Sequence, residues 1–345
     1  MAGEFRFSFG PWNIHEGADP FGPTVRDNVE FGKKLKLYKK LGFDGVQFHD
    51  DDAVPDMDSL SPEQIIKKAR KVRKMLDGEG LAAEFVAPRL WENPCTIDGA
   101  YTSNDPACRE YARDRSRRML DITAALDCNL VVLWLAREGT YIREAKDSKV
   151  AVERIVEAIN DMLAYNRDVK IAIEPKPNEP MDQAYIPTTG HAVAVSYLTD
   201  DPQRVGVNIE TAHVILAGLD PSDEMGFALA YDKLYTVHLN DQNGLKFDED
   251  KAFGSVNLRR AFNQVRILDQ YDYGKRGEFV GLDVKAMRTQ KREAATKHLS
   301  NSRAIFLRLL ELVRSLNRNK VQKLISQRDY EELDLLIINH LMGKP

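Results

Sequence analysis

Two short apolar runs, NLVVLWL at 129–135 and VKIAIE at 169–174, flank the longer segment DSKVAVERIVEAINDMLAY at 147–165. Runs of this length that are rich in valine, isoleucine and leucine are typical of strands buried on both faces of a parallel sheet. In the segment between them, apolar residues such as Ile155 and Ile159 recur every three or four positions, which predicts a helix with one buried face. The order strand, helix, strand therefore predicts a unit of a parallel α/β fold.

The same alternation of strands and amphipathic helices extends over most of the 345-residue chain. The other predicted strands are 5–12, 45–50, 82–88, 205–210, 234–239 and 278–284, and the clearest further helices are 28–41, 63–78, 107–126 and 255–269. Eight strand–helix units without an evident linker are the number that a closed parallel barrel needs. An open, doubly wound sheet is the alternative, but the first strand is not followed by the GxGxxG pattern of dinucleotide-binding sheets. We therefore predict an α/β fold, a (β/α)8 TIM barrel over residues 1–290.

The C-terminal part, residues 291–345, is predicted to be a helical extension. It is charged, and it is too long to be only the eighth barrel helix. The segment LISQRDYEELDLLIINHL at 324–341 is amphipathic, so one of its faces needs an apolar surface on the barrel or on a neighbouring subunit.

Composition and charge exclude several classes of function. The formal net charge is −4 and the chain has no basic stripe interleaved with aromatic residues, which argues against a nucleic-acid partner. No apolar run approaches the roughly 18–20 residues of a membrane span, and residues 1–9 lack the apolar core of a signal peptide. The three cysteines, an odd number without CxxC spacing, predict neither a disulfide framework nor a zinc knuckle. We therefore expect a cytoplasmic protein in a reducing compartment, without a membrane partner.

Polar side chains gather at the carboxyl ends of the predicted strands, which surround the active site in barrel enzymes. Strands five to eight each end in a side chain that can bind a metal, and two more carboxylates lie in the loop after strand seven. These candidate ligands are Glu174, Glu210, His213, His238, Asp248, Asp250 and Asp283. Taken singly, a carboxylate at a strand end is more often a solvated loop residue or a helix cap, so the hypothesis rests on their coincidence.

The number of converging carboxylates predicts a metal site. Buried carboxylates cannot all stay ionised without positive charge among them. Oxygen ligands suit hard ions such as magnesium and manganese, whereas histidine shifts the preference toward softer ions. One or two divalent ions are therefore expected at the mouth of the barrel.

At these positions the chain resembles the xylose isomerase (glucose isomerase) family, in its shorter class. The resemblance runs from about Phe7 to Arg288, and EPKPNEP and FDED, in this order and spacing, are its most specific motifs. The matching segments are DPFG at 19–22, GVQFHDDD at 45–52, DGAYTSND at 98–105, WLAREG at 134–139, EPKPNEP at 174–180, NIETAHVILAGL at 208–219, LNDQNGLKFDED at 239–250 and LDVKAMRT at 282–289. The resemblance implies a metal-dependent aldose–ketose isomerase that converts D-xylose to D-xylulose, or D-glucose to D-fructose, by ring opening and a 1,2-hydride shift. It further implies two divalent ions per subunit (manganese, cobalt or magnesium), no organic cofactor and a small-molecule sugar as substrate.

The resemblance also implies a role for each matching residue. The structural metal would be bound by Glu174, Glu210 and Asp283, and the catalytic metal by Glu210, His213, Asp248 and Asp250, with Glu210 bridging. His49, oriented by Asp52, resembles the histidine that assists opening of the cyclic sugar, and Lys176 resembles the lysine that polarises the carbonyl oxygen.

Five further residues are expected to contact the sugar. Trp12, Trp91 and Trp134 resemble the apolar walls of the family's sugar pocket, and Lys285 follows Asp283 as Lys176 follows Glu174. Phe21 resembles an aromatic residue that reaches into a neighbouring subunit's site, which implies a homotetramer.

The resemblance also implies a cis peptide bond between Glu179 and Pro180.

Two places depart from the family pattern. His238 stands where strand seven of the family presents an aspartate, and we expect it to bind the structural metal and to favour manganese or cobalt over magnesium. The alternative is that His238 only forms a hydrogen bond with a neighbouring carboxylate. Ala87 and Arg89 stand where strand three of the family has threonine and asparagine, which is expected to change the sugar that is accepted.

Other functions on the same fold remain alternatives. A different sugar isomerase or a 3-epimerase is the nearest, because related barrels use a strand-seven histidine as a ligand, although the EPKP motif and the pair Asp248 and Asp250 speak against an epimerase. A DNA-repair endonuclease would need more histidine ligands and a basic groove. A barrel kept only for protein binding would not need His49 and Lys176.

Overall fold

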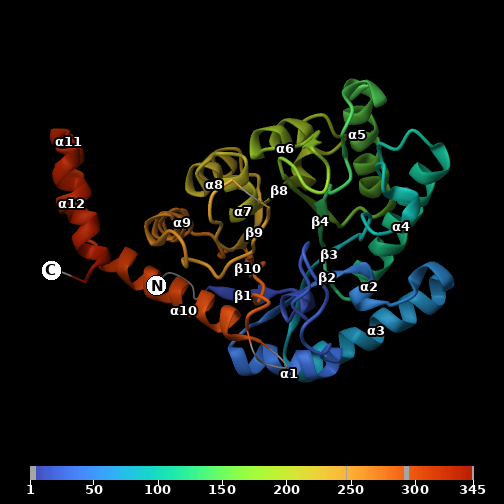
Figure 1. Cartoon of the computed structure of the whole chain (residues 1–345), viewed down its shortest axis with the longest axis horizontal. Coiled ribbons are helices and arrows are strands. Elements are labelled where there is room, and N and C mark those ends of the chain that lie inside the picture. Colours follow the sequence, from blue (N-terminus) through green and yellow to red (C-terminus); the bar gives the residue numbers. More distant parts are fainter. Residues whose placement is uncertain (1–4, 246, 291–294, 344–345) are drawn as a thin grey trace.

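The computed structural model describes residues 5–245, 247–290 and 295–343. At its centre lies a closed barrel of eight strands, in the order β1-β10-β9-β8-β6-β4-β3-β2 (Figure 1). The strands are β1 (Arg6–Phe9), β2 (Gly45–His49), β3 (Ala82–Ala87), β4 (Leu130–Trp134), β6 (Lys170–Glu174), β8 (Val205–Glu210), β9 (Leu234–Leu239) and β10 (Phe279–Leu282). All neighbouring strands are parallel, and β1 closes the barrel by pairing with both β2 and β10. The predicted TIM barrel and its eight strands are confirmed.

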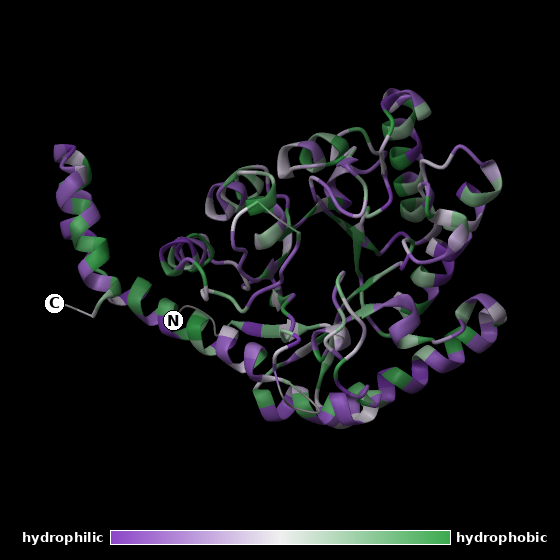
Figure 2. Ribbon diagram, viewed as in Figure 1, coloured by the Kyte–Doolittle hydropathy of each residue, from purple (hydrophilic) through white to green (hydrophobic). Residues whose placement is uncertain are grey.

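Helices surround the barrel because each has one apolar face to bury. They are α1 (Phe31–Leu41), α3 (Pro62–Glu79), α4 (Pro106–Ala125), α5 (Ser148–Tyr165), α6 (Thr189–Ser196), α8 (Pro221–Ala230), α9 (Leu258–Gln270) and α10 (Lys297–Ser315). Two shorter helices, α2 (Asp50–Ala53) and α7 (Thr211–Leu216), follow β2 and β8 directly. Apolar and polar residues alternate along the outer helices (Figure 2), and in α5 Ile155 and Ile159 are fully buried, as their spacing predicted.

The last three helices differ in how they meet the barrel. Phe306 of α10 packs edge-on against Phe5 and Phe7, with ring centroids 5.1 and 5.3 Å apart, so α10 is part of the outer layer. The next two, α11 (Arg318–Gln327) and α12 (Tyr330–Leu341), lead away from the barrel (Figure 1). The domain boundary near residue 290 lies beside residues 291–294, which are outside the described part of the chain, and it stays a prediction.

Two local features lie outside the regular barrel. A two-stranded sheet of β5 (Gly139–Thr140) and β7 (Gln183–Ala184) was not predicted. The cis peptide bond between Glu179 and Pro180 is confirmed.

A helix that crosses a membrane must be both long and apolar. None of the helices within the described ranges is long and apolar enough to do so.

The cysteines require a correction. Cys95 and Cys108 form a disulfide with their Cα atoms 5.5 Å apart, and Cys128 is free. The sequence predicted no disulfide framework and did not indicate this bridge, because spacing in the sequence does not show that the loop after β3 returns to the first turn of α4. The inference of a reducing compartment loses this support.

Candidate metal centre and substrate pocket

A cavity of about 400 Å³ opens at the carboxyl end of the barrel. The barrel fold explains this position, because every parallel strand ends at the same rim. Most of the predicted site residues line the cavity, namely Trp12, His49, Trp91, Trp134, Glu174, Glu210, His213, His238, Asp248, Asp250, Asp283 and Lys285.

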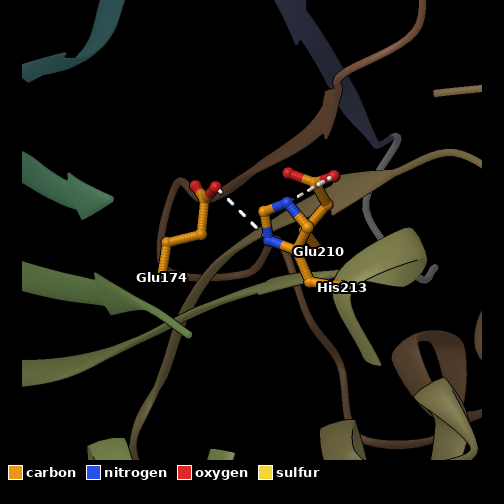
Figure 3. A group of neighbouring side chains, drawn as sticks. All are labelled: Glu174, Glu210 and His213. Atoms are coloured by element: carbon orange, nitrogen blue, oxygen red, sulfur yellow. Dashed lines mark ion pairs between the residues drawn. The ribbon is translucent and has the colours of Figure 1, made fainter. Parts of the chain in front are cut away.

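His213 lies among three carboxylates. It is placed there because α7 begins directly after β8, so His213 follows Glu210 by one helical turn. Its Nε2 is 3.2 Å from Glu210 and its Nδ1 is 3.6 Å from Glu174 (Figure 3). The same Nε2 is 3.1 Å from Asp248. The ring thus joins carboxylates from two strands and one loop.

Glu210 is the centre of the acidic groups. Potential ligand atoms lie within 4.8 Å of one another in three sets, and each set contains Glu210. The sets are Glu174, Glu210 and His213; Glu210, His238 and Asp283; and Glu210, Asp248 and Asp250. We call these seven residues the Glu210 cluster. The predicted ligands are therefore brought together as one group, with the predicted bridging residue shared by all sets.

Unsatisfied atoms in the cluster fit a bound cation. Among the described residues, Nδ1 of His213, Nε2 of His238 and Oδ1 of Asp248 are buried without a hydrogen-bond partner. Such atoms are costly in a protein interior unless an unseen ion or water satisfies them. Burial, followed by repulsion from Asp248, raises the pKa of Glu210 well above its usual value. The pKa of Asp250 is raised in the same way, so the protein neighbours alone do not stabilise all of these carboxylates in their ionised form.

Two lysines flank the cluster. Nζ of Lys176 is 2.9 Å from Oδ2 of Asp248, and Nζ of Lys285 is 2.8 Å from Oδ2 of Asp250. Lys176 lies beside the cavity, 5.3 Å from the ring of Trp134. Although burial opposes the charge of each lysine, its aspartate partner raises the pKa, so both stay cationic.

Two asparagines that were not predicted as site residues orient the cluster. Nδ2 of Asn208 contacts Glu174 and lies 3.2 Å from Nδ1 of His238. Asn240 donates a hydrogen bond to Oε1 of Glu210 at 3.0 Å. Asn208 could have been identified from the sequence, because it lies two residues before Glu210 on the same strand and both side chains therefore face the same side.

Aromatic residues form the other side of the cavity. Trp12 lies 4.2 Å from the ring of His49, His49 lies 5.1 Å from Trp91, and Trp91 lies 4.6 Å from Trp134. Nε1 of Trp12 donates to Asp283 at 2.8 Å, so this wall is tied to the Glu210 cluster. The cavity is therefore acidic on one side and apolar on the other.

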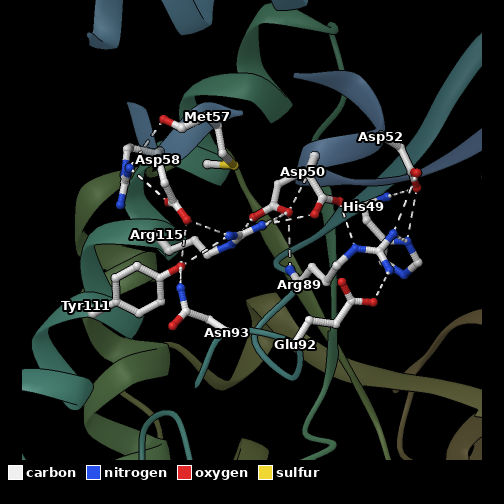
Figure 4. A network of polar contacts seen from close by, with 12 residues as sticks. His49, Asp50, Asp52, Met57, Asp58, Arg89, Glu92, Asn93, Tyr111 and Arg115 are labelled. Atoms are coloured by element: carbon white, nitrogen blue, oxygen red, sulfur yellow. Dashed lines mark hydrogen bonds and ion pairs between the residues drawn. The ribbon is translucent and has the colours of Figure 1, made fainter. Parts of the chain in front are cut away.

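His49 and the three aspartates after it form a polar network at the end of β2 (Figure 4). Nδ1 of His49 is 3.0 Å from Oδ2 of Asp52, which is the predicted pairing. Burial opposes the charge of Asp52, but its contacts with His49, which include a hydrogen bond from the main-chain N–H at 3.1 Å, and the nearby charge of Arg89 outweigh this and keep its pKa low.

Phe21 does not line the cavity of its own chain. Its side chain is 81% exposed, and its ring lies 5.6 Å from that of Phe247. The predicted role of Phe21 in a neighbouring subunit's site stays a prediction.

Comparison with known proteins places the chain in a family. The sequence model of the xylose isomerase-like TIM barrel family matches residues 35–299. The chain is 36% identical over 295 residues to a xylose isomerase of Thermus thermophilus, which covers 84% of this chain and 75% of that protein. It is 34% identical over 337 residues to a xylose isomerase of Thermus caldophilus, which covers 95% of this chain and 85% of that protein.

Solved structures share the fold at lower identity. A D-tagatose 3-epimerase-like protein superimposes with a TM-score of 0.64 and 16% identity, over 90% of this chain and 98% of that chain. On the sequence match and the two relatives, the chain belongs to the xylose isomerase-like TIM barrel family.

Proposed function

We propose that this protein is a divalent-metal-dependent aldose–ketose isomerase acting on D-xylose or a similar sugar. The observation that carries the proposal is the Glu210 cluster, in which one carboxylate belongs to three potential ligand sets opposite a wall of tryptophans. The identity of 34–36% to two xylose isomerases supports the same reaction class.

The Glu210 cluster has enough ligands for two ions that share Glu210. One would be held by Glu174, Glu210, His238 and Asp283, and the other by Glu210, His213, Asp248 and Asp250. Ions held there would supply Lewis-acid polarisation of sugar oxygens and would stabilise the negative charge that develops on them.

The other side chains bind and orient the sugar. Lys176 donates a hydrogen bond to the sugar oxygen nearest Asp248. His49 contacts the cyclic sugar while the sugar ring opens. The tryptophan wall keeps water from the reacting carbons, so hydrogen moves directly between them. In this step a hydride leaves C2 for C1, C2 becomes the carbonyl carbon, and the proton of the C2 hydroxyl passes to O1.

The experiment is the conversion of D-xylose by the metal-stripped and the metal-loaded protein in D2O, followed by NMR. We expect no reaction after chelation, and with added magnesium, manganese or cobalt a ketose without deuterium at C1. Deuterium at C1 would contradict the direct shift. If D-xylose did not react, and a ketose offered in its place were converted to its 3-epimer with no aldose formed, the epimerase alternative would be supported instead.

Glu210→Gln is the variant that tests the shared ligand. Because Glu210 belongs to every set, we expect both ions to be lost, with an affinity decrease beyond the roughly 10–100-fold caused by removing an outer-shell partner. Metal content and titration calorimetry measure it. The control is Glu157→Gln on the outer face of α5, where the side chain is 62% exposed and pairs with Arg113. If the Glu210 variant kept both ions, the cluster would not be the metal site.

A further inference from the structure

Arg89 is fixed against the ring of His49 by several contacts. Its main-chain N–H donates to Oδ1 of Asp50 at 3.2 Å. Its Nε donates to Oδ1 of Asp51 at 2.8 Å, and its Nη1 donates to Glu92 at 3.2 Å. The remaining contact is from Nη2 to Nδ1 of His49, at 2.8 Å (Figure 4). Three of the four nitrogens of Arg89 thus have an acidic partner, and the fourth lies against the ring.

The position of Asp50 is itself fixed in the interior. Nε and Nη2 of Arg115 donate to its two oxygens at 2.8 and 2.7 Å. The side chain of Asp50 is fully buried and that of Arg115 is 7% exposed. Arg89 is therefore held by a rigid buried pair, and its contact with His49 follows from the packing of β2, β3 and α4.

Nδ1 of His49 has two neighbours that require opposite protonation. Besides Arg89, it has Oδ2 of Asp52 at 3.0 Å. A guanidinium has only donors and stays charged, whereas a carboxylate is an acceptor. A protonated Nδ1 can therefore satisfy Asp52, an unprotonated Nδ1 can satisfy Arg89, and no single state satisfies both.

The hydrogen-bond count favours the unprotonated Nδ1. In that state Nη2 of Arg89 donates to the ring, and Oδ2 of Asp52 still accepts the main-chain N–H of His49 at 3.1 Å. With Nδ1 protonated, two donors would face each other at 2.8 Å, and the nearest oxygen of Asp52 to Nη2 is 3.6 Å away, beyond hydrogen-bond range. A doubly protonated ring would place a cation against a cation.

We propose that Arg89 is a positioning residue that acts through His49: it keeps Nδ1 as an acceptor, so the proton of the neutral ring lies on Nε2. Nε2 has no hydrogen-bond partner in the described ranges, and His49 lines the cavity. His49 therefore presents an N–H donor to a sugar oxygen. If Asp52 alone controlled the ring, Nε2 would be an acceptor instead. The effect on the sugar rests on the proposed function, but the assignment of the proton does not.

The arrangement also shows that Arg89 is not a free anion site. Its charge is shared by Asp51, Asp52 and Glu92 within 3.6 Å. A phosphate or carboxylate on the sugar would meet these acids together with the cation.

The decisive measurement is the protonation of His49 by long-range proton–nitrogen NMR of the full-length, magnesium-loaded protein labelled with 15N-histidine. His49→Gln assigns the signal among the seven histidines. We expect the proton on Nε2 in the wild type and on Nδ1 in Arg89→Met, where Asp52 is the remaining partner. The tautomer ratio should change by about 10–100-fold, the effect of losing one hydrogen bond to a charged group. A wild-type ring protonated on Nδ1, or a ratio unchanged in Arg89→Met, would overturn the proposal.

Two further variants separate this role from a structural one. Arg137→Met removes a nearby arginine that donates to the main-chain oxygen of Trp91 at 3.1 Å, and it should leave the tautomer unchanged. In Asp52→Asn we expect the proton on Nε2, as in the wild type. If the proton were on Nδ1 in the wild type and on Nε2 in Asp52→Asn, Asp52 would be the residue that sets the tautomer of His49. The wild type and Asp52→Asn decide the question even if Arg89→Met does not fold.

Kinetics then test the consequence for the sugar. D-Xylose must open its ring before isomerisation, whereas D-glyceraldehyde has too few carbons to close a five- or six-membered ring. Arg89→Met should change kcat/KM for D-xylose by about tenfold or more relative to the change for D-glyceraldehyde. Equal changes in kcat/KM for the two sugars would overturn the proposed effect of Arg89 on opening of the cyclic sugar. A wild type inactive on both would contradict the proposed function, while the NMR result would still decide the role of Arg89.

Discussion

His238 is, with His213, one of the two imidazoles among the candidate ligands of the Glu210 cluster. Its Nδ1 is 3.3 Å from Glu174 and 3.6 Å from Glu210, and its Nε2 is among the buried atoms without a hydrogen-bond partner in the described part of the chain. Both interpretations from the sequence therefore have a physical basis, because the ring contacts carboxylates and also has a free nitrogen that could bind an ion. The two are distinguished by metal selectivity.

His238→Asp is the variant that tests ligation. If imidazole is a ligand, the wild type should be activated more by manganese or cobalt than by magnesium, since these ions bind imidazole better. The variant should gain relative activity with magnesium. Activity of the metal-stripped protein with each ion is the measurement. Equal activation of the wild type by all three ions, unchanged in the variant, would show that His238 only forms hydrogen bonds with carboxylates.

At the scale of secondary-structure elements, the ion pair of Asp50 and Arg115 joins the end of β2 to α4. Breaking it by Asp50→Asn leaves a buried arginine without its main partner, which typically costs about 3–5 kcal/mol of stability. We expect the lower end, because Arg115 also contacts Asp58 at 3.1 Å. Urea unfolding measures the loss. The control is Asp161→Asn, which breaks the more exposed pair with Arg117 and should cost less than about 1 kcal/mol. Similar losses in the two variants would contradict the assigned importance of the buried pair.

Glu84 of β3 links strands inside the barrel. It accepts hydrogen bonds from Ser8 of β1, from Gln47 of β2 at 3.2 Å and from Thr236 of β9 at 2.7 Å. Burial raises its pKa above the usual 4.5, although the bonds from Ser8 and Thr236 oppose this. The folded state thus holds this proton more tightly than the unfolded state. Its contribution to stability is complete below pH 4.5 and is lost as the pH rises through the raised value.

Glu84→Gln isolates this effect, because glutamine has nearly the same shape and cannot ionise. We expect the melting temperature of the variant to rise relative to that of the wild type as the pH increases from about 5 to 8. Thermal unfolding of both proteins at several pH values measures the difference. A difference that stays constant or reverses would show that Glu84 is already ionised at pH 5.

At the scale of the whole molecule, several large apolar side chains remain exposed outside the barrel core. Phe21 is 81% exposed, and Leu335 and Ile338 of α12 are 50% and 38% exposed. Exposed apolar side chains are typical of interfaces between proteins where they gather in a patch. The predicted homotetramer would cover these side chains, and the loop that carries Phe21 would complete the cavity of a neighbouring subunit.

Sedimentation velocity at micromolar concentration tests the assembly, for which we expect a tetramer.

The contribution of Phe21 to a neighbouring cavity is tested by activity. Phe21→Ala should lower kcat/KM by about tenfold, the scale of losing one apolar contact in a substrate pocket. Phe227→Ala, which removes an aromatic ring of α8 that is 41% exposed, should leave activity unchanged. A monomeric wild type with full activity would exclude the shared site.

The sequence by itself determined the strands, the main helices and the candidate ligands. These features are local: the period of apolar residues identifies a buried strand or helix face, and a parallel barrel places every strand end at one rim. Glu174, Glu210, His238 and Asp283 could therefore be selected before any contact was known, and EPKPNEP indicated the family.

Only the tertiary structure decided which side chains meet. The disulfide of Cys95 and Cys108 and the contact of Arg89 with His49 join positions that are separated along the chain. No local period encodes such contacts, because they depend on barrel closure and on the path of each loop. The protonation of His49 is set by two residues that compete for one nitrogen, and that competition exists only when β2, β3 and α4 are packed together.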